Sequence, residues 1–423
     1  MTWLQRYNLR RLVHGSLWLM PVLAIGLVCV VAPLLRWLDH ATGWRLLNFT
    51  PDGARMVLGA FTSSMLTLVV FVMSSLLIVV QLASAQLTPR IIAMAFANRP
   101  LKWVLSIFTF AYAYTIAASG RVEDTVPQLP VAFAILCNLA CIAIFFWFVQ
   151  WFGSSMRPIA VLQTVAETGR AVVESVYPDP FDPAEGQPGW SPAAEADGAV
   201  VEHIGRSGVI LAYGQSALLT LAERAEAVIE LVPQVGDYMA RGDALFRIRT
   251  GSRSIDAGAL RACVAIGPER TMEQDPRFAF RIMVDIANKA LSPAINDPTT
   301  AVLALDQIHH LLMDVGTRRL DTGEARDAQG RLRLCYRTPD WVDFVGLAVT
   351  EIRHFGATSI QVARRLQAMI EHLLKVLPEA RKAALQQELA LLQRSIQRTF
   401  PDEEDRADAQ VGDLQGLGSS ESS

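Results

Sequence analysis

Two groups of residues in this chain combine side-chain types and spacings that could do chemistry. In the first group, Thr67, Ser74, Gln81 and Thr88 recur every seven residues, with Ser64 beside them. A 3.5-residue repeat keeps such side chains on one stripe of a helix. Hydroxyl and amide groups on a stripe can bond across a helix–helix seam, or they can line a pore. The packing seam is the simpler interpretation, and the pore stays open as the alternative.

The second group is cationic and lies in the C-terminal half of the chain. Arg270, Arg277 and Arg281 are followed by Asn296 and Asp297 at the start of a predicted helix. Guanidinium groups and free amides at a helix N-terminus can hold a small anion such as a nucleotide or phosphate. The simpler interpretation is that Asp297, followed by proline, caps the helix, while Asn296 takes left-handed backbone geometry. An anionic ligand on the cytoplasmic side is the alternative.

Arg281 of the second group has a possible ion-pair partner within the chain, because Asp285 lies one helical turn after it. An ion pair at this spacing would occupy the arginine. Further along, Asp306, His310 and Asp314 align at intervals of four residues. Charged side chains on a solvated helix face explain that alignment more simply than a metal site does.

Other catalytic patterns do not occur. The sequence contains no P-loop, H-E-x-x-H or G-x-S-x-G motif, and its two cysteines outside the apolar stretches, Cys263 and Cys335, stand alone. A net charge of −3 gives no reason to expect nucleic-acid binding. We therefore expect a protein that is not an enzyme and carries no metal or cofactor.

The polar stripe must be positioned by a membrane domain. Four long apolar stretches lie within residues 1–152: Leu17–Leu38, Met56–Leu82, Leu101–Ala118 and Leu129–Phe152. Each has the roughly 17–20 residues that a helix needs to cross a bilayer. Lipid-facing backbone must be paired internally, which predicts four transmembrane helices. No charged residue lies near the middle of any stretch, in contrast to most ion and proton pathways.

The flanking charges predict the orientation of these spans. The N-terminus and the second loop carry cations and no acid, whereas the first and third loops contain Asp39, Asp52 and Glu123. The cations on the acid-free side are Arg6, Arg10, Arg11, Arg90, Arg99 and Lys102. By the positive-inside rule, the N- and C-termini are cytoplasmic.

The rest of the chain predicts a cytoplasmic α+β domain. Residues 153–198 read as a helical extension followed by a proline-rich linker, and residues 199–255 as a small β-rich part. Residues 256–398 read as mainly helical, and the acidic and Gly/Ser-rich end, 399–423, as a disordered tail.

The β-rich part contains the segment Val235–Leu245, which resembles the turn-rich repeat of barrel-sandwich domains that carry lipoyl or biotinyl groups. Gly236 and Gly242 suit tight turns between short strands. A carrier needs a modifiable lysine, and no lysine lies between Lys102 and Lys289. We therefore expect a barrel-like part with a structural or interactive role.

Three motifs together resemble a known family. The first is QLASAQLTPR at 81–90, and the second is Arg270-Thr271 followed by Gln274-Asp275. The third is VDIA-x-KALSP-x-INDP at 284–298. The chain is similar, up to about residue 398, to the bacterial predicted membrane proteins catalogued as domain of unknown function 2254. The resemblance implies four spans and a cytoplasmic domain, located in the bacterial inner membrane, and it implies no activity.

Two functional hypotheses follow from these features. The first is a non-enzymatic, homo-oligomeric membrane protein, channel-like or transporter-like, with a cytoplasmic regulatory domain. The second is a membrane-anchored scaffold or ligand sensor without a permeation path. Both hypotheses take the lipid bilayer as a partner, and either could use the polar stripe.

Overall fold

The computed structural model describes residues 2–43, 49–88, 90, 99–123, 125–183, 198–250 and 254–416. Two compact units make up the chain. Leu9–Arg157 is the membrane unit, and Met1–Asn8 together with Pro158–Ser423 is the α+β unit. Most of the predicted proline-rich linker, residues 184–197, lies outside the described residues, as does the end of the tail beyond residue 416.

The membrane unit is helical. After α1 (Trp3–Gly15), which begins in the α+β unit, come α2 (Leu19–Thr42), α3 (Pro51–Gln86), α5 (Arg99–Ser119) and α6 (Gln128–Ser155). Helices α2, α5 and α6, and α3 as far as Gln81, are long and apolar enough to cross a membrane. They correspond to the four predicted spans.

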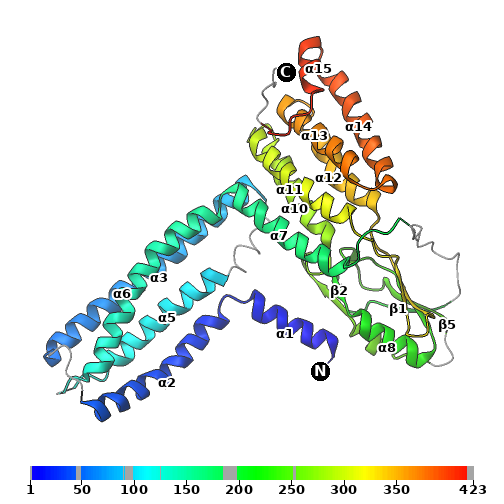
Figure 1. Cartoon of the computed structure of the whole chain (residues 1–423). Helices are drawn as coiled ribbons and strands as arrows, with labels where there is room; N and C mark the ends of the chain where they lie inside the picture. The colour runs from blue at the N-terminus through cyan, green and yellow to red at the C-terminus, as the bar shows by residue number, and fades with distance from the viewer. Residues whose placement is uncertain are drawn as a thin grey trace. The chain divides into compact units, whose positions relative to one another are not determined.

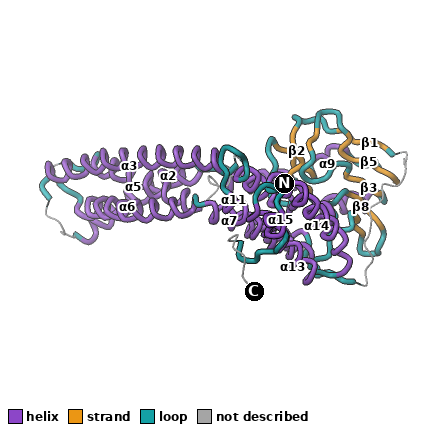
Figure 2. The backbone as a smooth tube through the Cα atoms, turned by 90° about the horizontal axis from the view of Figure 1, so that it is seen from above, coloured by secondary structure: helices purple, strands orange, loops and turns teal. Residues whose placement is uncertain are grey.

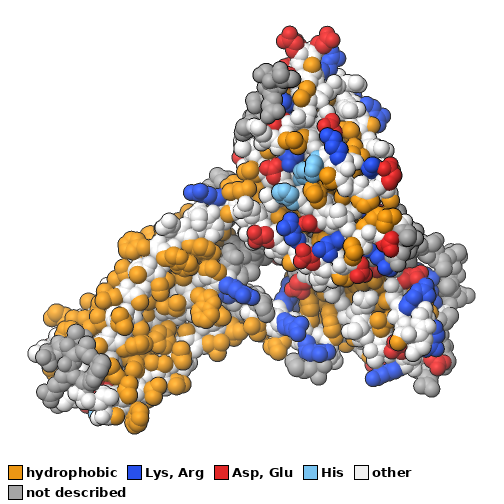
Figure 3. All heavy atoms as spheres, viewed as in Figure 1, with side chains coloured by type: hydrophobic (Ala, Val, Ile, Leu, Met, Phe, Trp, Pro, Cys, Tyr) orange, Lys and Arg blue, Asp and Glu red, His pale blue; other side chains and the backbone are white. Residues whose placement is uncertain are grey.

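Helix α5 occupies the centre of the membrane unit, where it packs against α2, α3 and α6. The long helices run side by side in both views (Figures 1 and 2). Phe108 and Tyr114 of α5 are fully buried, in line with the low mean hydropathy of this span, since protein rather than lipid surrounds much of it. The face of this unit that Figure 3 shows is covered largely with hydrophobic side chains, as lipid contact requires.

The α+β unit begins with a helix that follows α6 after only residues 156–157. Its helices are α7 (Pro158–Val176), α8 (Gln215–Ala225), α9 (Ala257–Arg261), α10 (Pro276–Ala290), α11 (Pro298–Gly316), α12 (Trp341–Phe355), α13 (Ile360–Val376), α14 (Glu379–Thr399) and α15 (Glu403–Ala409). Its strands are β1 (Ala199–Glu202), β2 (Gly208–Tyr213), β3 (Val228–Leu231), β4 (Tyr238–Met239), β5 (Ala244–Thr250), β6 (Val264–Gly267), β7 (Glu324–Arg326) and β8 (Leu332–Tyr336).

The strands form two open sheets, with orders β1-β5-β3-β8-β7 and β4-β2-β6. All pairs are antiparallel except β3–β8, which is parallel. The expected barrel is therefore wrong, because Val235–Leu245 places β4 in one sheet and β5 in the other instead of closing a single sheet. Gly236 and Gly242 have φ angles of +92° and +95°, as the predicted tight turns require.

The β-rich part does not end at residue 255, as the sequence suggested. Strand β8 joins the larger sheet beside β3, with Ile229 opposite Leu334. Parallel strands require a long crossover connection, and here it includes α9, β6, α10 and α11. Sheets and helices consequently share one continuous unit.

Helix α7 packs against α10 and α11 (Figure 1). A glycine makes this close approach possible, because a Cβ at Gly169 would lie 2.6 Å from Cβ of Ala279 and 3.2 Å from Leu311. The apolar faces of α10, α11, α12 and α13 complete the core, with Phe280, Leu305 and Phe344 fully buried.

The predicted disordered tail is ordered as far as residue 416. Helix α15 lies within it, and Asp402 caps that helix by accepting from the Glu404 amide. Beyond α15, Gln361 donates to the Gly416 carbonyl at 2.6 Å and Arg364 donates to the Val411 carbonyl at 3.1 Å. Side chains of α13 therefore hold the tail by hydrogen bonds to its backbone. The composition of the tail gives no sign of these contacts.

The extreme N-terminus belongs to the α+β unit. The Leu4 amide donates to the Ala262 carbonyl at 3.3 Å, and the ring of Trp3 lies against Gly214. Residues 2–8 and the chain after residue 157 must therefore lie on the same side of the membrane. The chain must then cross the membrane an even number of times between residues 8 and 157. The four apolar helices give an even number of crossings.

Candidate functional site

The polar stripe faces outward from the membrane unit. Ser64, Thr67, Ser74 and Gln81 are all exposed on α3. The opposite face of this helix contributes Met65, Val72, Leu76 and Val80 to the apolar core, and these residues are 6% exposed or less. The stripe is therefore directed away from α5 and α6.

Most of the stripe has no side-chain hydrogen-bond partner among the described residues of the subunit. The Thr67 hydroxyl donates to the Ser63 carbonyl of its own helix at 3.0 Å. Ser64, Ser74 and Gln81 have no side-chain hydrogen bond to any residue that the structure describes. Gly59, one turn further toward the N-terminus of α3, has open space where a side chain would be. The outer face of α3 thus combines small residues with unsatisfied polar groups.

Thr88 does not belong to this stripe, although its spacing predicted that it would. Helix α3 ends at Gln86, and Thr88 is only 5% exposed. Its hydroxyl accepts a weak hydrogen bond from the Arg90 amide at 3.4 Å. The heptad spacing has no meaning beyond the end of the helix, because the chain no longer follows the helical rotation.

The bundle also contains a buried polar pair that the sequence reading missed. Asn138 of α6 donates to the hydroxyl of Thr115 of α5 at 2.9 Å and to the Ala134 carbonyl at 2.8 Å. Thr115 in turn donates to the Ala111 carbonyl. Asn138 is 1% exposed, so this pair fixes the contact of α5 with α6 from within the apolar core. The signal in the sequence for this pair was Asn138 itself, an amide within an otherwise apolar stretch.

The motif at residues 270–275 joins the smaller sheet to the helices. Gln274 accepts from the amide of Tyr213 at 2.9 Å and donates to the carbonyl of the same residue at 3.2 Å. Arg270 forms an ion pair with Asp275, whose side chain is 4% exposed. The guanidinium of Arg270 also lies where a Cβ would stand on Gly236, so this turn needs glycine for space as well as for its φ angle.

The other two arginines of the predicted anion site lie on α10. Arg281 forms ion pairs with Asp285 and with Glu351 of α12, and Asn288 also donates to Glu351 at 2.7 Å. The expected pairing of Arg281 with Asp285 is thus confirmed. Hydrogen bonds from Arg281 lower the pKa of Glu351. Arg277 is partly buried at the start of the helix. Burial raises the pKa of Asp275, and the nearby guanidinium groups of Arg270 and Arg277 oppose that shift.

Asp297 caps α11, as predicted. It accepts from the Thr300 amide at 3.1 Å and from the Thr300 hydroxyl at 2.6 Å. Asn296 has a φ of +49°, which confirms its left-handed geometry. The helix N-terminus therefore already holds a carboxylate, which would repel a second anion at the same amides.

The structure does not bring the five predicted anion-site residues together. Arg277 lies in the first turn of α10, whereas Asn296 and Asp297 follow its last turn. Thirteen residues at 1.5 Å per residue separate these ends by about 20 Å. Two of the three arginines are moreover neutralised by acids within the chain. Packing and capping contacts thus account for Arg270, Arg281 and Asp297.

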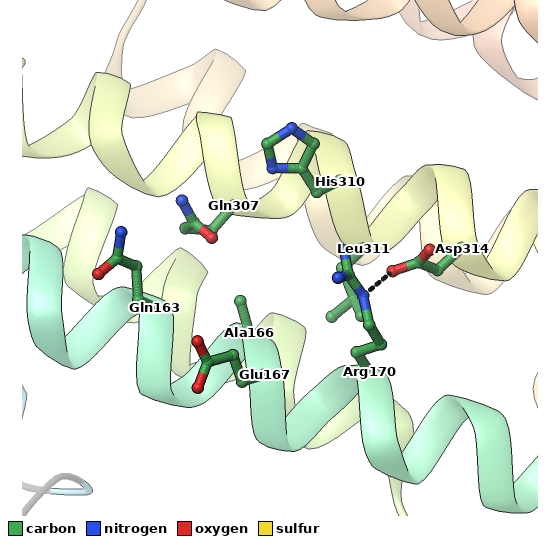
Figure 4. A pocket seen from close by; sticks show the side chains of 8 residues that line it. All are labelled: Gln163, Ala166, Glu167, Arg170, Gln307, His310, Leu311 and Asp314. Carbon is green, nitrogen blue, oxygen red and sulfur yellow. Dashed lines mark hydrogen bonds and ion pairs between the residues drawn. The ribbon is translucent and has the colours of Figure 1, made fainter.

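A polar groove lies between α7 and α11 (Figure 4). Its volume is about 510 Å³, and Ala166 and Leu311 are among its lining residues. An ion pair between Arg170 and Asp314, at 2.7 Å, bridges the two helices at one part of the groove. The remaining polar side chains are Gln163, Glu167, Gln307 and His310. These four have no hydrogen bond to the residues that the structure describes, so they could contact a polar ligand.

A pair of histidines, one buried and one half-buried, connects α11 with α13. His309 and His372 approach to 2.9 Å between Nε2 and Nδ1, and Arg365 donates to Nδ1 of His309 at 3.2 Å. Arg365 also donates to Asp306 at 2.7 Å. Because arginine can only donate, Nδ1 of His309 must accept, so its Nε2–H must donate to His372. This network could not be predicted from the sequence, because its members lie on two helices, α11 and α13.

The predicted alignment of Asp306, His310 and Asp314 does not form a single site. Asp306 bonds to α13, Asp314 bonds to α7, and His310 lines the groove. No group of three or more metal-ligating residues occurs within the described ranges.

The α+β unit should lose stability on mild acidification because of His309. Burial, together with the charge of Arg365, lowers the pKa of His309 from 6.5 to about 3. Between these two values the unfolded chain binds a proton that the folded chain does not bind. The contribution of His309 to the free energy of unfolding is therefore fully present above pH 6.5. It is lost as the pH falls toward 3, by up to about 1.4 kcal/mol per pH unit.

This dependence can be measured from the free energy of unfolding of the detergent-solubilised protein between pH 7 and pH 5. His309→Gln should flatten the dependence, whereas His310→Gln, which changes the exposed neighbour, should preserve it. Equal slopes for the wild type and His309→Gln would show that His309 is not held neutral.

Comparison with known proteins finds relatives in Mycobacterium. The chain is 28% identical over 412 residues to uncharacterized proteins Mb1321c of Mycobacterium bovis and Rv1290c of Mycobacterium tuberculosis. The aligned region covers 93% of this chain and 79% of each relative. No solved structure matches the chain.

The model of the family described as "Predicted membrane protein (DUF2254)" matches residues 14–372. This range includes all four apolar helices and the α+β unit through most of α13. It also includes the three motifs that carried the sequence resemblance. The chain is a predicted membrane protein and belongs to the DUF2254 family.

Proposed function

We propose that this protein is a non-enzymatic, homo-oligomeric, channel-like membrane protein of the bacterial inner membrane. In this proposal the subunits meet along the outer face of α3, and the polar stripe surrounds their common axis. The α+β unit lies on the cytoplasmic side and regulates the assembly. A small polar ligand that binds between α7 and α11 is the candidate regulator.

One observation carries the proposal. Ser64, Ser74 and Gln81 are turned away from the bundle and have no hydrogen-bond partner among the described residues of their own subunit. Leaving a hydroxyl or amide unpaired in an apolar medium costs about 2–7 kcal/mol. A neighbouring subunit, or water on an axis between subunits, would supply the missing partners. Lipid chains cannot supply them.

The position of the groove supports a regulatory role for the α+β unit. Helix α7, which forms one wall, begins three residues after the end of α6. A ligand that bridges α7 and α11 would therefore bind to an element that continues almost directly from a span. The groove also fits the second candidate function, a membrane-anchored ligand sensor without a pore. In that case α3 forms a dry packing seam.

Oxidative cross-linking in native membranes tests whether subunits meet along α3. We expect Ser74→Cys, in a background without the five native cysteines, to give a cross-linked dimer, because both copies present this position to the interface. Leu76→Cys should give none, because Leu76 is 1% exposed and faces the core of its own subunit.

A matched position on another helix controls for random collision. Phe146 of α6 is 67% exposed, so Phe146→Cys reports encounters between lipid-facing surfaces. Cross-linking at position 146 with none at positions 67, 74 and 81 would move the interface away from α3 and contradict the proposal.

A further inference from the structure

The helix that precedes the first span has an apolar face that no described part of the chain covers. On α1, Leu9, Leu12 and Val13 are between 48% and 54% exposed. At 100° per residue, these three side chains lie within a sector of about 100°. Trp3 and Tyr7 lie on the other side of the helix, where they stack on each other at 5.3 Å between ring centroids.

The location of this face points to its partner. Helix α1 ends at Gly15, and the span α2 begins at Leu19. The four Cα–Cα steps from Gly15 to Leu19 can cover at most about 14 Å, so the end of α1 must stay close to the point where α2 enters the membrane. Trp18, in this connection, is 60% exposed, and tryptophan is enriched at the level of lipid headgroups.

The charge of the segment fits an anionic surface. Residues 2–18 contain Arg6, Arg10 and Arg11 and no acidic residue. Arg6 is exposed beside the apolar face, and Arg11 is partly exposed. An amphipathic helix with arginines and a half-exposed apolar face is typical of helices that lie in the membrane interface.

We propose that α1 lies on the bilayer surface and binds anionic lipid headgroups. Leu9, Leu12 and Val13 enter the boundary between headgroups and acyl chains, while Arg6, beside this face, contacts lipid phosphates. The N-terminal end of the same helix is fixed to the α+β unit through Trp3 and Leu4. Helix α1 therefore anchors this unit to the lipid surface. The inference requires α2 to span the membrane, and it is independent of assembly through α3.

Fluorescence quenching in nanodiscs tests the position of α1. The probe is a polarity-sensitive fluorophore on Leu12→Cys, in the full-length protein without its native cysteines, and the quencher is a lipid brominated near the top of its acyl chains. Strong quenching is expected at position 12. The matched control is the same labelled protein in nanodiscs of unbrominated lipid, which should show no quenching. Absence of quenching at position 12 would overturn the surface position.

The lipid specificity is tested by titrating phosphatidylglycerol into phosphatidylcholine nanodiscs. Quenching at position 12 should rise with the anionic fraction. Arg6→Gln should weaken the apparent lipid affinity by about fivefold, as expected for an arginine near an anionic surface. Asn8→Gln, at an exposed position of the same helix, adds no charge and should leave the titration unchanged. Identical quenching at every lipid composition would refute anionic-lipid binding.

Discussion

Arg270→Ala should lower the free energy of unfolding of the α+β unit by about 3–5 kcal/mol, because it leaves a buried carboxylate without its ion-pair partner. The side chain of Asp275 is 4% exposed, and Arg270 is its only ion-pair partner among the described residues. Urea unfolding of the solubilised protein, read by proteolysis of the unfolded fraction, would measure the change. The loss should be smaller at pH 5 than at pH 8, because burial raises the pKa of Asp275 and protonation relieves the uncompensated charge.

A matched control separates this effect from the general loss of an arginine. Arg326 pairs with Glu324 at 2.8 Å, but the two side chains are 55% and 37% exposed. Arg326→Ala should therefore change stability by no more than about 1 kcal/mol. Equal losses for the two variants would show that burial of the Arg270–Asp275 pair has no special importance.

Ser74→Leu should weaken assembly of the protein by roughly 10- to 100-fold, whereas Ser74→Ala should have little effect. A leucine at this position adds bulk to the α3 face on every subunit and prevents close approach of the backbones, an overpacking cost of about 1–3 kcal/mol. Alanine keeps the surface small and removes one hydroxyl. Mass photometry in detergent over a range of protein concentrations would give the subunit distribution.

The fold of a single subunit should not change in Ser74→Leu, because Ser74 is exposed and faces away from α5 and α6. Unchanged thermal unfolding of the subunit would confirm that assembly alone is affected. Normal assembly of Ser74→Leu together with a loss of assembly in a variant on α2 or α6 would assign the interface to another helix.

Local sequence patterns predicted the helices and turns well. The four apolar stretches match α2, α3, α5 and α6, and Asp297 with Asn296 forms the expected cap and turn. These features depend on residues within one helical turn or one span, where spacing and side-chain type determine the local geometry.

The candidate sites depended on contacts that spacing cannot reveal. Glu351, which helps to neutralise Arg281, is 70 residues away from it, and His372, which pairs with His309, is 63 residues away. The heptad repeat showed that Thr67, Ser74 and Gln81 share one face of α3. Only the packing of α5 and α6 on the opposite face shows that this stripe is exposed.

The predicted barrel failed for a similar reason. Gly236 and Gly242 correctly indicated tight turns, but turns alone do not determine which strands pair. Strand β8 joins β3 from a distant part of the chain, and the connection through two long helices cannot be recognised from the glycine spacing. Local sequence patterns therefore could not predict the long-range pairing of strands.

Access of water to the outer face of α3 is the most direct test of the proposed channel-like assembly. Single cysteines at positions 67, 74 and 81, in membranes that hold the assembled protein without its native cysteines, would be exposed to a charged, membrane-impermeant thiol reagent. The proposal predicts modification at all three positions and none at Val72 or Leu76, which face the core of the subunit. Complete protection of positions 67, 74 and 81 in the assembled protein would contradict a polar path along the axis.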